Sequence, residues 1–244
     1  MKIVFKDIQK QQQNLTQEER DALILYKAAF YRPINKIVGF LRQHNLTVQD
    51  IESNEMVAGR VKQIISNCYE KYVNSRRKEK IIWKQPNALE RVEKEYKGIP
   101  NITMYRELVL KSIPYLESAL NKIKIIEDIY VYRGVVGNEL APDQRFLSTT
   151  CKSTVAYAFM YDRLQNSKKQ KDCYNVFEIK IPKGSPVIAF TDDLFTDELR
   201  EGSVFCEEQQ EILIDPINFE FEFTEISNGR IYCEAKPKNK SNIK

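Results

Sequence analysis

The sequence has a single histidine, five scattered cysteines and no long apolar run among its 244 residues. One imidazole, His44, excludes metal sites built on two or more histidines, and a hydrolase with a catalytic histidine would depend on that residue alone. The cysteines are odd in number and contain no CxxC pair, which argues against a disulfide scaffold and a structural zinc site. We therefore expect no metal.

Membrane-directed segments are missing as well. No stretch approaches the roughly 20 consecutive apolar residues that span a bilayer, and the run MKIVFKDIQKQQQN lacks the apolar core of a secretory signal. We expect a protein of the cytosol, or one delivered to a host cytosol as an effector or viral enzyme, without a membrane partner. The net charge of +4 is mild and the basic runs are short, so the sequence gives no strong nucleic-acid signal.

The first half of the chain has the periodicity of helices. Thr16 and Glu19 form a T-x-x-E capping box ahead of apolar residues spaced at three and four. Pro33 is expected to end or kink that first helix. Two further stretches, VAGRVKQIISNCYEKYV and MYRELVLKSIPYLESALNKI, also have helical periodicity.

Short β-rich runs replace the helices in the second half. They cover 129–134, 145–150, 174–182, 186–190, 209–214, 219–223 and 230–235. In FEFEF, Phe219, Phe221 and Phe223 share one face, which is typical of a half-buried antiparallel strand. The Asn-Gly pair after it predicts a tight hairpin. Helices followed by strands indicate an α+β protein. We expect one domain over 1–236, its β-core at about 125–236, and a flexible basic tail at 237–244.

Arg133 stands in the run IYVYRG, after the apolar residues Ile129 and Val131. If this run is a strand, Ile129, Val131 and Arg133 share one side, so a guanidinium projects from a face that otherwise resembles a core. An unpaired charge there would be costly. Two kinds of partner fit: the phosphate or carboxylate of a ligand, or a buried Asp or Glu in a structural salt bridge. Gly134, directly after it, would let a ligand approach the backbone closely.

Two other predicted strands carry polar runs, RFLSTT and EEQQEILI. In the first, Ser148, Thr149 and Thr150 place three hydroxyls at a strand end, where they could orient a carboxylate or a ribose, although threonine is also common in strands. In the second, Gln209 and Glu211 would point the same way. A carboxylate beside an amide can stabilise a sugar cation, as in glycoside cleavage. The alternative is an acidic edge strand kept soluble by its charge.

The three motifs, taken in order, resemble a known family signature. The strand with Arg133 and Gly134, then FLSTT, then QQEILI are similar to the Arg, Ser-Thr-Ser and Gln/Glu-x-Glu motifs of the ADP-ribosyltransferase exoenzymes. The joint match is much more specific than any single motif, although Thr150 stands where the pattern has Ser. EIKIPKGSPVIAF is similar to the family's strand, turn and next strand, and LTQEERDALILYKAAFYRPIN followed by LR is similar to its helical start. The likeness covers about 125–225 and 14–42.

This resemblance implies an α+β fold in which a helical N-terminal half packs on two antiparallel sheets, with NAD in the cleft between them. It implies a mono-ADP-ribosyltransferase that uses NAD as co-substrate. The implied catalytic residues are Glu211, Gln209, Ser148 and Arg133. The implied cofactor-binding residues are Arg133, Gly134, Ser148, Thr149, Arg42 and Arg163.

The resemblance also implies a role for each main residue. Glu211 would bind the 2′-hydroxyl of the nicotinamide ribose and stabilise the oxocarbenium ion that forms as nicotinamide leaves. Ser148 would position Glu211, and Arg133 would anchor the NAD phosphates. The backbone of Gly134 would lie close to the nicotinamide amide. Arg42 and Arg163 would be further phosphate contacts.

The acceptor of the ADP-ribose is less defined by the sequence. In the family, glutamine at the position of Gln209 is associated with acceptors other than arginine, such as asparagine, so a macromolecular acceptor, foremost a protein, is expected. An NAD glycohydrolase, with water as acceptor, and a non-catalytic module that binds a nucleotide or a partner stay open. Residues 43–100 are either an inserted helical module for target recognition or a scaffold, and the oligomeric state is open too.

Overall fold

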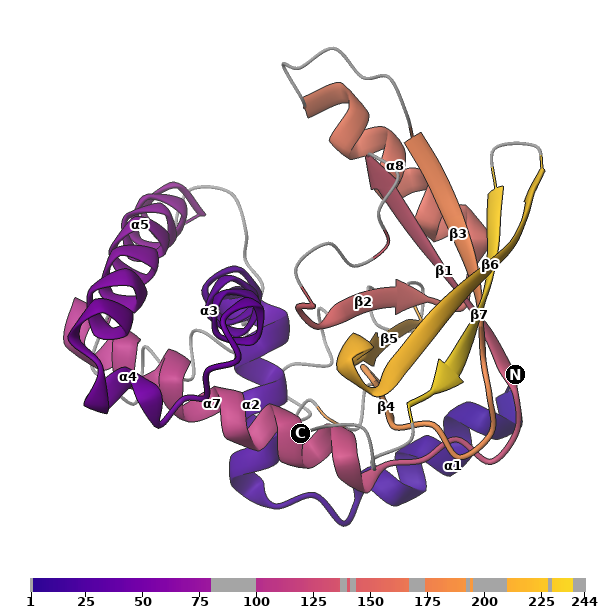
Figure 1. The fold of residues 1–244 in the computed structure, drawn as a ribbon, viewed down its shortest axis with the longest axis horizontal. Helices are drawn as coiled ribbons and strands as arrows, with labels where there is room; N and C mark the ends of the chain where they lie inside the picture. The colour runs from indigo at the N-terminus through magenta and orange to yellow at the C-terminus, as the bar shows by residue number, and fades with distance from the viewer. Residues whose placement is uncertain are drawn as a thin grey trace. The chain divides into compact units, whose positions relative to one another are not determined.

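The chain folds into two compact units (Figure 1). The computed structural model describes residues 2–79, 100–136, 140, 144–166, 174–191, 194, 210–227 and 230–238. One unit takes in residues 1–14, 120–191 and 205–244, and we call it the sheet unit; the other takes in 15–119 and 192–204, and we call it the helical unit. A single functional domain over 1–236 stays a prediction.

The helical unit begins with the expected capping box. The Thr16 N–H donates to Glu19 Oε2 at 2.8 Å, and the Glu19 N–H donates to Thr16 Oγ1 at 3.3 Å. The first helix ends at Leu25, ahead of Pro33; a π-helical turn over Tyr26–Phe30 follows it, and Pro33 is the third residue of the next helix. The elements in order are α2 (Gln17–Leu25), a π-helical turn η1 (Tyr26–Phe30), α3 (Tyr31–Gln43), α4 (Asp50–Ser53), α5 (Glu55–Glu79) and α7 (Ile102–Lys122). The predicted helical periodicity is confirmed.

An aromatic cluster forms the centre of the helical unit. Tyr105 of α7 is buried, and its ring centroid lies 4.9 Å from that of Phe30 and 5.2 Å from that of Tyr72. These rings come from η1, α5 and α7, so the cluster ties the two long helices to the π-helical turn. Burial raises the pKa of the Tyr105 hydroxyl well above its usual range.

Among the residues that the structure describes, the sheet unit has seven strands joined in one hydrogen-bonded sheet, in the order β4-β5-β2-β1-β3-β7-β6. The strands are β1 (Ile129–Val136), β2 (Leu147–Thr150), β3 (Tyr174–Ile181), β4 (Val187–Ala189), β5 (Glu211–Ile214), β6 (Phe219–Ser227) and β7 (Arg230–Pro237). Every predicted strand is present, and the α+β class is confirmed. The described strand β7 extends one residue into the predicted tail.

The predicted pair of antiparallel sheets is corrected in two details. The part β4-β5-β2 and the part β1-β3-β7-β6 belong to one sheet, and they meet through a single register pair, Tyr132 opposite Thr150. In addition, β3 and β7 run parallel. The sequence pattern fixes which face of a strand is apolar, but it does not fix which strand edges pair.

The edge strand β6 changes its burial along its length. Phe219 is buried, whereas Phe223 is 57% exposed, so the alternation of FEFEF is correct but its apolar face is covered only at the start. At the other end, Ser227 pairs with Arg230 in the antiparallel register of β6 and β7, as the predicted hairpin requires.

Two helices complete the sheet unit. Helix α1 (Lys2–Gln12) belongs to it by its contacts, although more than a hundred residues separate α1 from the first strand. Helix α8 (Ser153–Asn166) lies against β1 and β3 (Figure 1). Among the helices that the structure describes in either unit, none has both the length and the apolar character that crossing a membrane requires.

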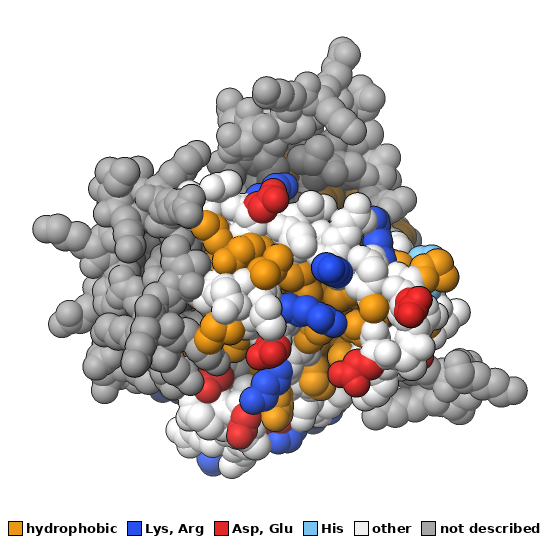
Figure 2. Space-filling view, turned by 90° about the vertical axis from the view of Figure 1, so that its left-hand side faces the viewer, with side chains coloured by type: hydrophobic (Ala, Val, Ile, Leu, Met, Phe, Trp, Pro, Cys, Tyr) orange, Lys and Arg blue, Asp and Glu red, His pale blue; other side chains and the backbone are white. Residues whose placement is uncertain are grey.

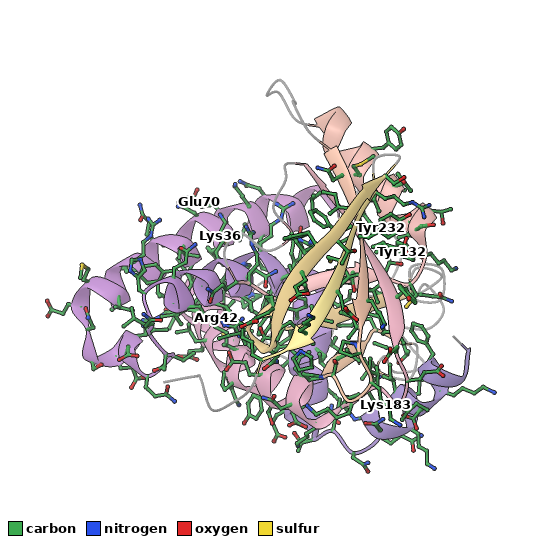
Figure 3. All side chains as sticks on the ribbon, turned by 45° about the vertical axis from the view of Figure 1, so that its right-hand side comes forward. Lys36, Arg42, Glu70, Tyr132, Lys183 and Tyr232 are labelled. Atoms are coloured by element: carbon green, nitrogen blue, oxygen red, sulfur yellow. The ribbon has the colours of Figure 1, made fainter. Side chains whose placement is uncertain are left out.

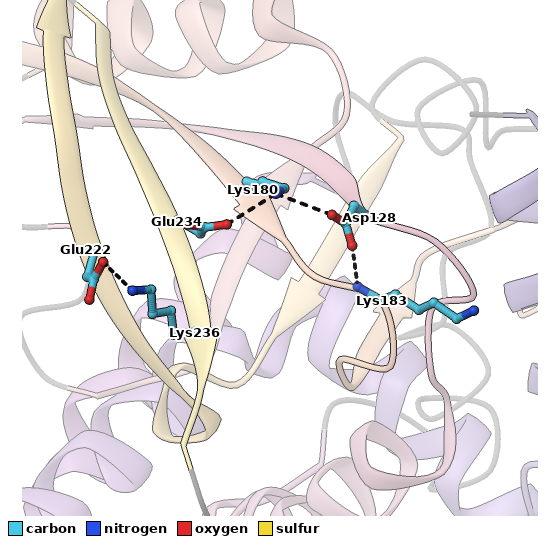
Figure 4. Close-up of polar contacts among 6 residues, drawn as sticks. All are labelled: Asp128, Lys180, Lys183, Glu222, Glu234 and Lys236. Atoms are coloured by element: carbon cyan, nitrogen blue, oxygen red, sulfur yellow. Dashed lines mark hydrogen bonds and ion pairs between the residues drawn. The ribbon is translucent and has the colours of Figure 1, made fainter.

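On one face of the molecule, the charged side chains of the described residues are not segregated by sign (Figure 2). On the face shown in Figure 2, the lysine and arginine side chains of the described residues alternate with acidic and apolar ones. On the sheet unit, Lys180 Nζ lies 3.4 Å from Asp128 Oδ2 and 3.2 Å from Glu234 Oε1 (Figure 4). Lys236 and Glu222 form a third pair at 2.6 Å. All three pairs are accessible to solvent and of modest strength.

The contacts of the Asp128 carboxylate predict that part of the free energy of unfolding is lost at acid pH. The Lys183 backbone N–H donates to this carboxylate at 2.8 Å and, together with Lys180, holds the pKa of that carboxyl below its usual value. A depressed folded-state pKa stabilises the fold above the unfolded pKa of about 3.9, and the benefit is lost as the pH falls further. We expect wild type to be more stable than Asp128→Asn at pH 7, with the difference shrinking below about pH 4. Thermal unfolding across pH 3–7 measures this, and a difference independent of pH would contradict it.

Candidate functional site

Strand β1 places Arg133 on the core face of the sheet, as predicted. Val131 and Val135, two residues to either side, are buried, while Arg133 is half-buried. One guanidinium N–H, at Nη1, donates to the carbonyl oxygen of Ser148 on β2. Arg133 therefore holds the backbone of the strand that carries the hydroxyl run.

The three hydroxyls of β2 have three different partners. Ser148 Oγ donates to Glu211 Oε1 on β5, so these two motifs, 63 residues apart, meet directly. Thr149 is buried, and its hydroxyl donates to the carbonyl oxygen of Ile212 at 2.8 Å. Thr150 Oγ1 accepts from the Lys152 N–H at 3.1 Å, just before α8 begins. The Ser148 hydroxyl is therefore bonded to the candidate catalytic carboxylate.

Glu211 is the first residue of β5 and is 9% exposed. Its carbonyl oxygen accepts from the Phe190 N–H at 3.0 Å. The residue before it, Gln210, has φ +44°, in the left-handed region that non-glycine residues rarely adopt. The Gln210 carbonyl accepts from the Cys151 N–H at 3.1 Å. The backbone on both sides of Glu211 is thus fixed by neighbouring strands.

This geometry changes the basis of one prediction. We expected Gln209 and Glu211 to share a face because side chains alternate along a strand. The strand begins only at Glu211, after Gln210 with its left-handed backbone. Because side chains alternate only within a strand, alternation does not place Gln209 on the face of Glu211. Gln209 itself lies outside the described residues, and its role stays a prediction.

A pocket opens where β1, β2, β5 and α8 meet. It measures about 410 Å³ counted to its open mouth. Its lining residues are Tyr132, Arg133 and Gly134 of β1, Ser148, Thr149 and Thr150 of β2, Glu211 of β5, and Val155, Ala156 and Phe159 of α8. Five of the predicted site residues line this one pocket. One wall therefore carries a guanidinium, a carboxylate and a hydroxyl, and the helix supplies an apolar wall.

Gly134 has a structural role that its sequence position does not reveal. A Cβ added there would lie 2.2 Å from the Ala156 carbonyl oxygen and 2.9 Å from Met160 Cβ. The absence of a side chain lets α8 approach the backbone of β1. Gly134 also lines the pocket, so the predicted closeness of this backbone to a ligand stays possible alongside its packing role.

Substitution of Gly134 is expected to destabilise the sheet unit. In Gly134→Ala, the methyl group would force α8 away from β1, and overpacking of this kind costs about 1–3 kcal/mol. Urea unfolding measures the change. Gly59→Ala is the matched control, because Gly59 lies on the exposed side of α5 with no atom near an added Cβ. That control should stabilise the protein by about 0.5–1 kcal/mol, and equal effects at both positions would contradict the packing role.

Helix α8 is fixed from its other side by an arginine. Arg230 Nε donates to the Tyr157 hydroxyl at 3.1 Å, and Arg230 Nη1 lies 3.4 Å from Glu178 Oε2. Glu178 pairs in register with Tyr132 and Tyr232, which lie near each other on the sheet (Figure 3). This polar row holds the helix that forms the apolar wall of the pocket.

Sequence reasoning missed Phe159. This side chain of α8 is 50% exposed and lines the pocket, so an aromatic ring borders its mouth. The aromatic residue type, soon after the hydroxyl run, was the available signal. Arg163 lies further along α8, and its side chain lies outside the description, so its phosphate contact stays a prediction.

Arg42 belongs to the helical unit, whereas the pocket belongs to the sheet unit. Its Nη2 forms an ion pair with Glu117 Oε1 of α7 at 3.2 Å, and only 10% of the Arg42 side chain is exposed. Figure 3 shows it on its helix. The contact within the helical unit is structural, and a phosphate contact for Arg42 stays a prediction.

Two observations bear on other chemistry near the pocket. Burial raises the pKa of the Cys151 thiol to about 12, so this cysteine is protonated at neutral pH and is a poor nucleophile. Within the described parts of the chain, no three His, Cys, Asp or Glu side chains are grouped so that they could hold a metal ion.

Comparison with known proteins gives similarity in structure alone. The sequence matches no family model and no curated protein. Among solved structures, the chain is similar to Plx2a, an ADP-ribosyltransferase toxin from Paenibacillus larvae, with 17% identity, a TM-score of 0.45, and coverage of 96% of this chain and 94% of that one. It is also similar to the Vis toxin of Vibrio splendidus, with 16% identity, a TM-score of 0.43, and coverage of 98% of this chain and 85% of that one. For the Clostridium limosum C3 exoenzyme the identity is 13%, the TM-score 0.43, and the coverage 93% of this chain and 90% of that one. Of these three proteins, Plx2a and the Vis toxin are described as ADP-ribosyltransferases.

Proposed function

We propose that the protein is a mono-ADP-ribosyltransferase that cleaves NAD at its nicotinamide bond and transfers ADP-ribose to a macromolecular acceptor. The observation that carries the proposal is the hydrogen bond from Ser148 to Glu211 at the wall of a pocket that Arg133 also lines. Three motifs far apart in the sequence supply these groups. The charged groups of the pocket and its partly apolar wall support this assignment.

The chemistry assigned to Glu211 is electrostatic. As the bond between the ribose carbon and the nicotinamide nitrogen breaks, its electron pair leaves with nicotinamide and positive charge develops on the ribose ring. A carboxylate fixed beside that ring stabilises the transition state more than the ground state. Ser148 donates to one carboxylate oxygen, and because an ionised carboxylate can accept several hydrogen bonds, a ribose hydroxyl can donate to it as well.

Arg133 is assigned to the phosphates of NAD. Its guanidinium is half-buried on the pocket wall, and planar N–H donors suit phosphate oxygens. Because it also donates to the Ser148 carbonyl, the same side chain links phosphate binding to the strand that positions Glu211. Phe159 and Val155 give the pocket an apolar side against which a flat ring can pack.

The acceptor is proposed from the sequence. In the family that the sequence resembles, glutamine at the position of Gln209 is associated with acceptors other than arginine, so we propose an acceptor such as asparagine on a protein. The nucleophile would attack the ribose carbon and lose a proton as the new bond forms. Water in that role would make the protein an NAD glycohydrolase instead.

The test incubates the protein with biotin-labelled NAD and with eukaryotic or bacterial lysates. Label on a discrete protein band supports the transferase, and mass spectrometry then identifies the acceptor residue. Nicotinamide release without labelled protein would instead indicate a glycohydrolase. NAD binding without nicotinamide release would show a binding module and would overturn the proposal.

A further inference from the structure

Helix α1 ends in two glutamines that reach different parts of the sheet unit. Gln11 pairs with the backbone of Lys124: its Oε1 accepts from the Lys124 N–H at 2.9 Å and its Nε2 donates to the Lys124 carbonyl at 2.8 Å. The side-chain amide thus imitates a peptide group of a neighbouring strand. This contact lies just before β1.

Gln12 makes the equivalent contact with β4. Its side chain is fully buried; Oε1 accepts from the Ala189 N–H at 3.1 Å and Nε2 donates to Thr191 Oγ1 at 3.0 Å. Strand β4 is the last strand on its side of the described sheet. On its outer edge the Val187 N–H donates to the Ile123 carbonyl at 3.2 Å, and Gln12 supplies the next acceptor along that edge.

The inner edge of β4 supports Glu211. Ala189 pairs with Ile212 in the antiparallel register, and the next residue, Phe190, donates its N–H to the Glu211 carbonyl at 3.0 Å. Two successive N–H groups of this segment therefore point in opposite directions, that of Ala189 to Gln12 and that of Phe190 to Glu211. Because β5 starts at Glu211 and the preceding residue is left-handed, this hydrogen bond fixes the end of the strand that carries the carboxylate.

We propose that Gln12 is a positioning residue for Glu211. By holding the outer edge of β4, it fixes the strand whose inner edge sets the backbone of Glu211, and so the angle at which the carboxylate meets Ser148. This role rests on the proposed function. It makes the N-terminal helix part of the catalytic framework, although Gln12 itself touches neither the pocket nor the substrate.

The test compares Gln12→Met with Gln11→Met. Each replacement removes one amide from the same helix, and both are expected to lower stability. Only Gln12→Met is expected to lower kcat for nicotinamide release, by about 10- to 100-fold, as a small misplacement of a catalytic group does. The KM for NAD should stay unchanged in both variants. Rates are measured at a temperature where thermal unfolding shows both proteins folded.

Hydrogen exchange supplies a readout that does not depend on turnover. The Phe190 amide should exchange faster in Gln12→Met than in Gln11→Met, because its strand loses its outer partner. Gln12→Glu, measured at a pH low enough to keep the buried carboxyl protonated, keeps an acceptor for the Ala189 N–H and a donor for Thr191 Oγ1, so it should recover part of kcat.

The outcomes are distinct. Equal kcat and equal Phe190 exchange in the two methionine variants, with an active wild type, would overturn the role of Gln12 and leave the proposed function standing. A wild-type protein that releases no nicotinamide would overturn both.

Discussion

Replacing Glu211 by glutamine should lower kcat for nicotinamide release by about 10²–10³-fold or more, because preorganised electrostatic groups supply rate effects of this size. Glutamine keeps the shape of the side chain and an oxygen that can accept from Ser148. What it loses is the negative charge that opposes the positive charge on the ribose. The measurement is steady-state nicotinamide release with and without acceptor, and NAD affinity should change much less than kcat.

The matched control for this substitution is Glu220→Gln. Glu220 is an exposed residue of β6, so removing its charge tests whether net charge alone alters turnover. We expect wild-type kcat in this variant. A Glu211→Gln protein that retains full turnover would remove Glu211 from the mechanism and, with it, the main support for the transferase.

Arg133→Lys is the second substitution with a large expected effect. Lysine keeps the charge but loses the planar fork, so it cannot hold the Ser148 carbonyl and a phosphate together. A hydrogen bond to a charged group contributes about 1.5–3 kcal/mol, which corresponds to a loss of about 10- to 100-fold in kcat/KM. Because both NAD binding and the position of Ser148 are affected, KM should rise and kcat should fall.

Arg106→Lys provides the control for the arginine-to-lysine change. Arg106 is exposed on α7 in the helical unit, and its replacement should leave both constants unchanged. If Arg133→Lys raised KM and left kcat unchanged, Arg133 would act only in NAD binding. Its hydrogen bond to the Ser148 carbonyl would then not contribute to kcat.

The face assignments were predictable from local sequence. Alternation placed Arg133 on the same side as Val131, and the structure confirms this. The run FLSTT and the run EILI were both predicted as strands, and both are. These predictions succeeded because the side-chain direction in a strand depends on the local backbone alone.

The meeting of Ser148 with Glu211 came from a family resemblance and not from local pattern. Nothing in either run specifies that β2 pairs with β5 rather than with another strand. The same limit explains why two sheets were expected where one forms, since the single pair of Tyr132 and Thr150 joins them. Strand pairing depends on the free energy of the whole sheet, which a short run does not contain.

Some residues acquire their roles only from distant neighbours. Gly134 was assigned to a ligand, yet the backbone of α8 also requires it to be a glycine. Gln12 stood in an unremarked polar run, and only the fold brings β4 within reach of its amide. Arg42 was expected at a phosphate, and its described ion pair is with Glu117 of its own unit.

The sequence by itself determined the class of fold, the faces of the strands and the residue types of the site, because these follow from the periodicity of side chains and from short motifs. The tertiary structure decided which motifs share one pocket, which glycine is required by packing and which buried amide completes a strand edge. Those features depend on contacts between residues that are tens to more than a hundred positions apart in the sequence. A short run of residues does not specify which distant residues it will contact.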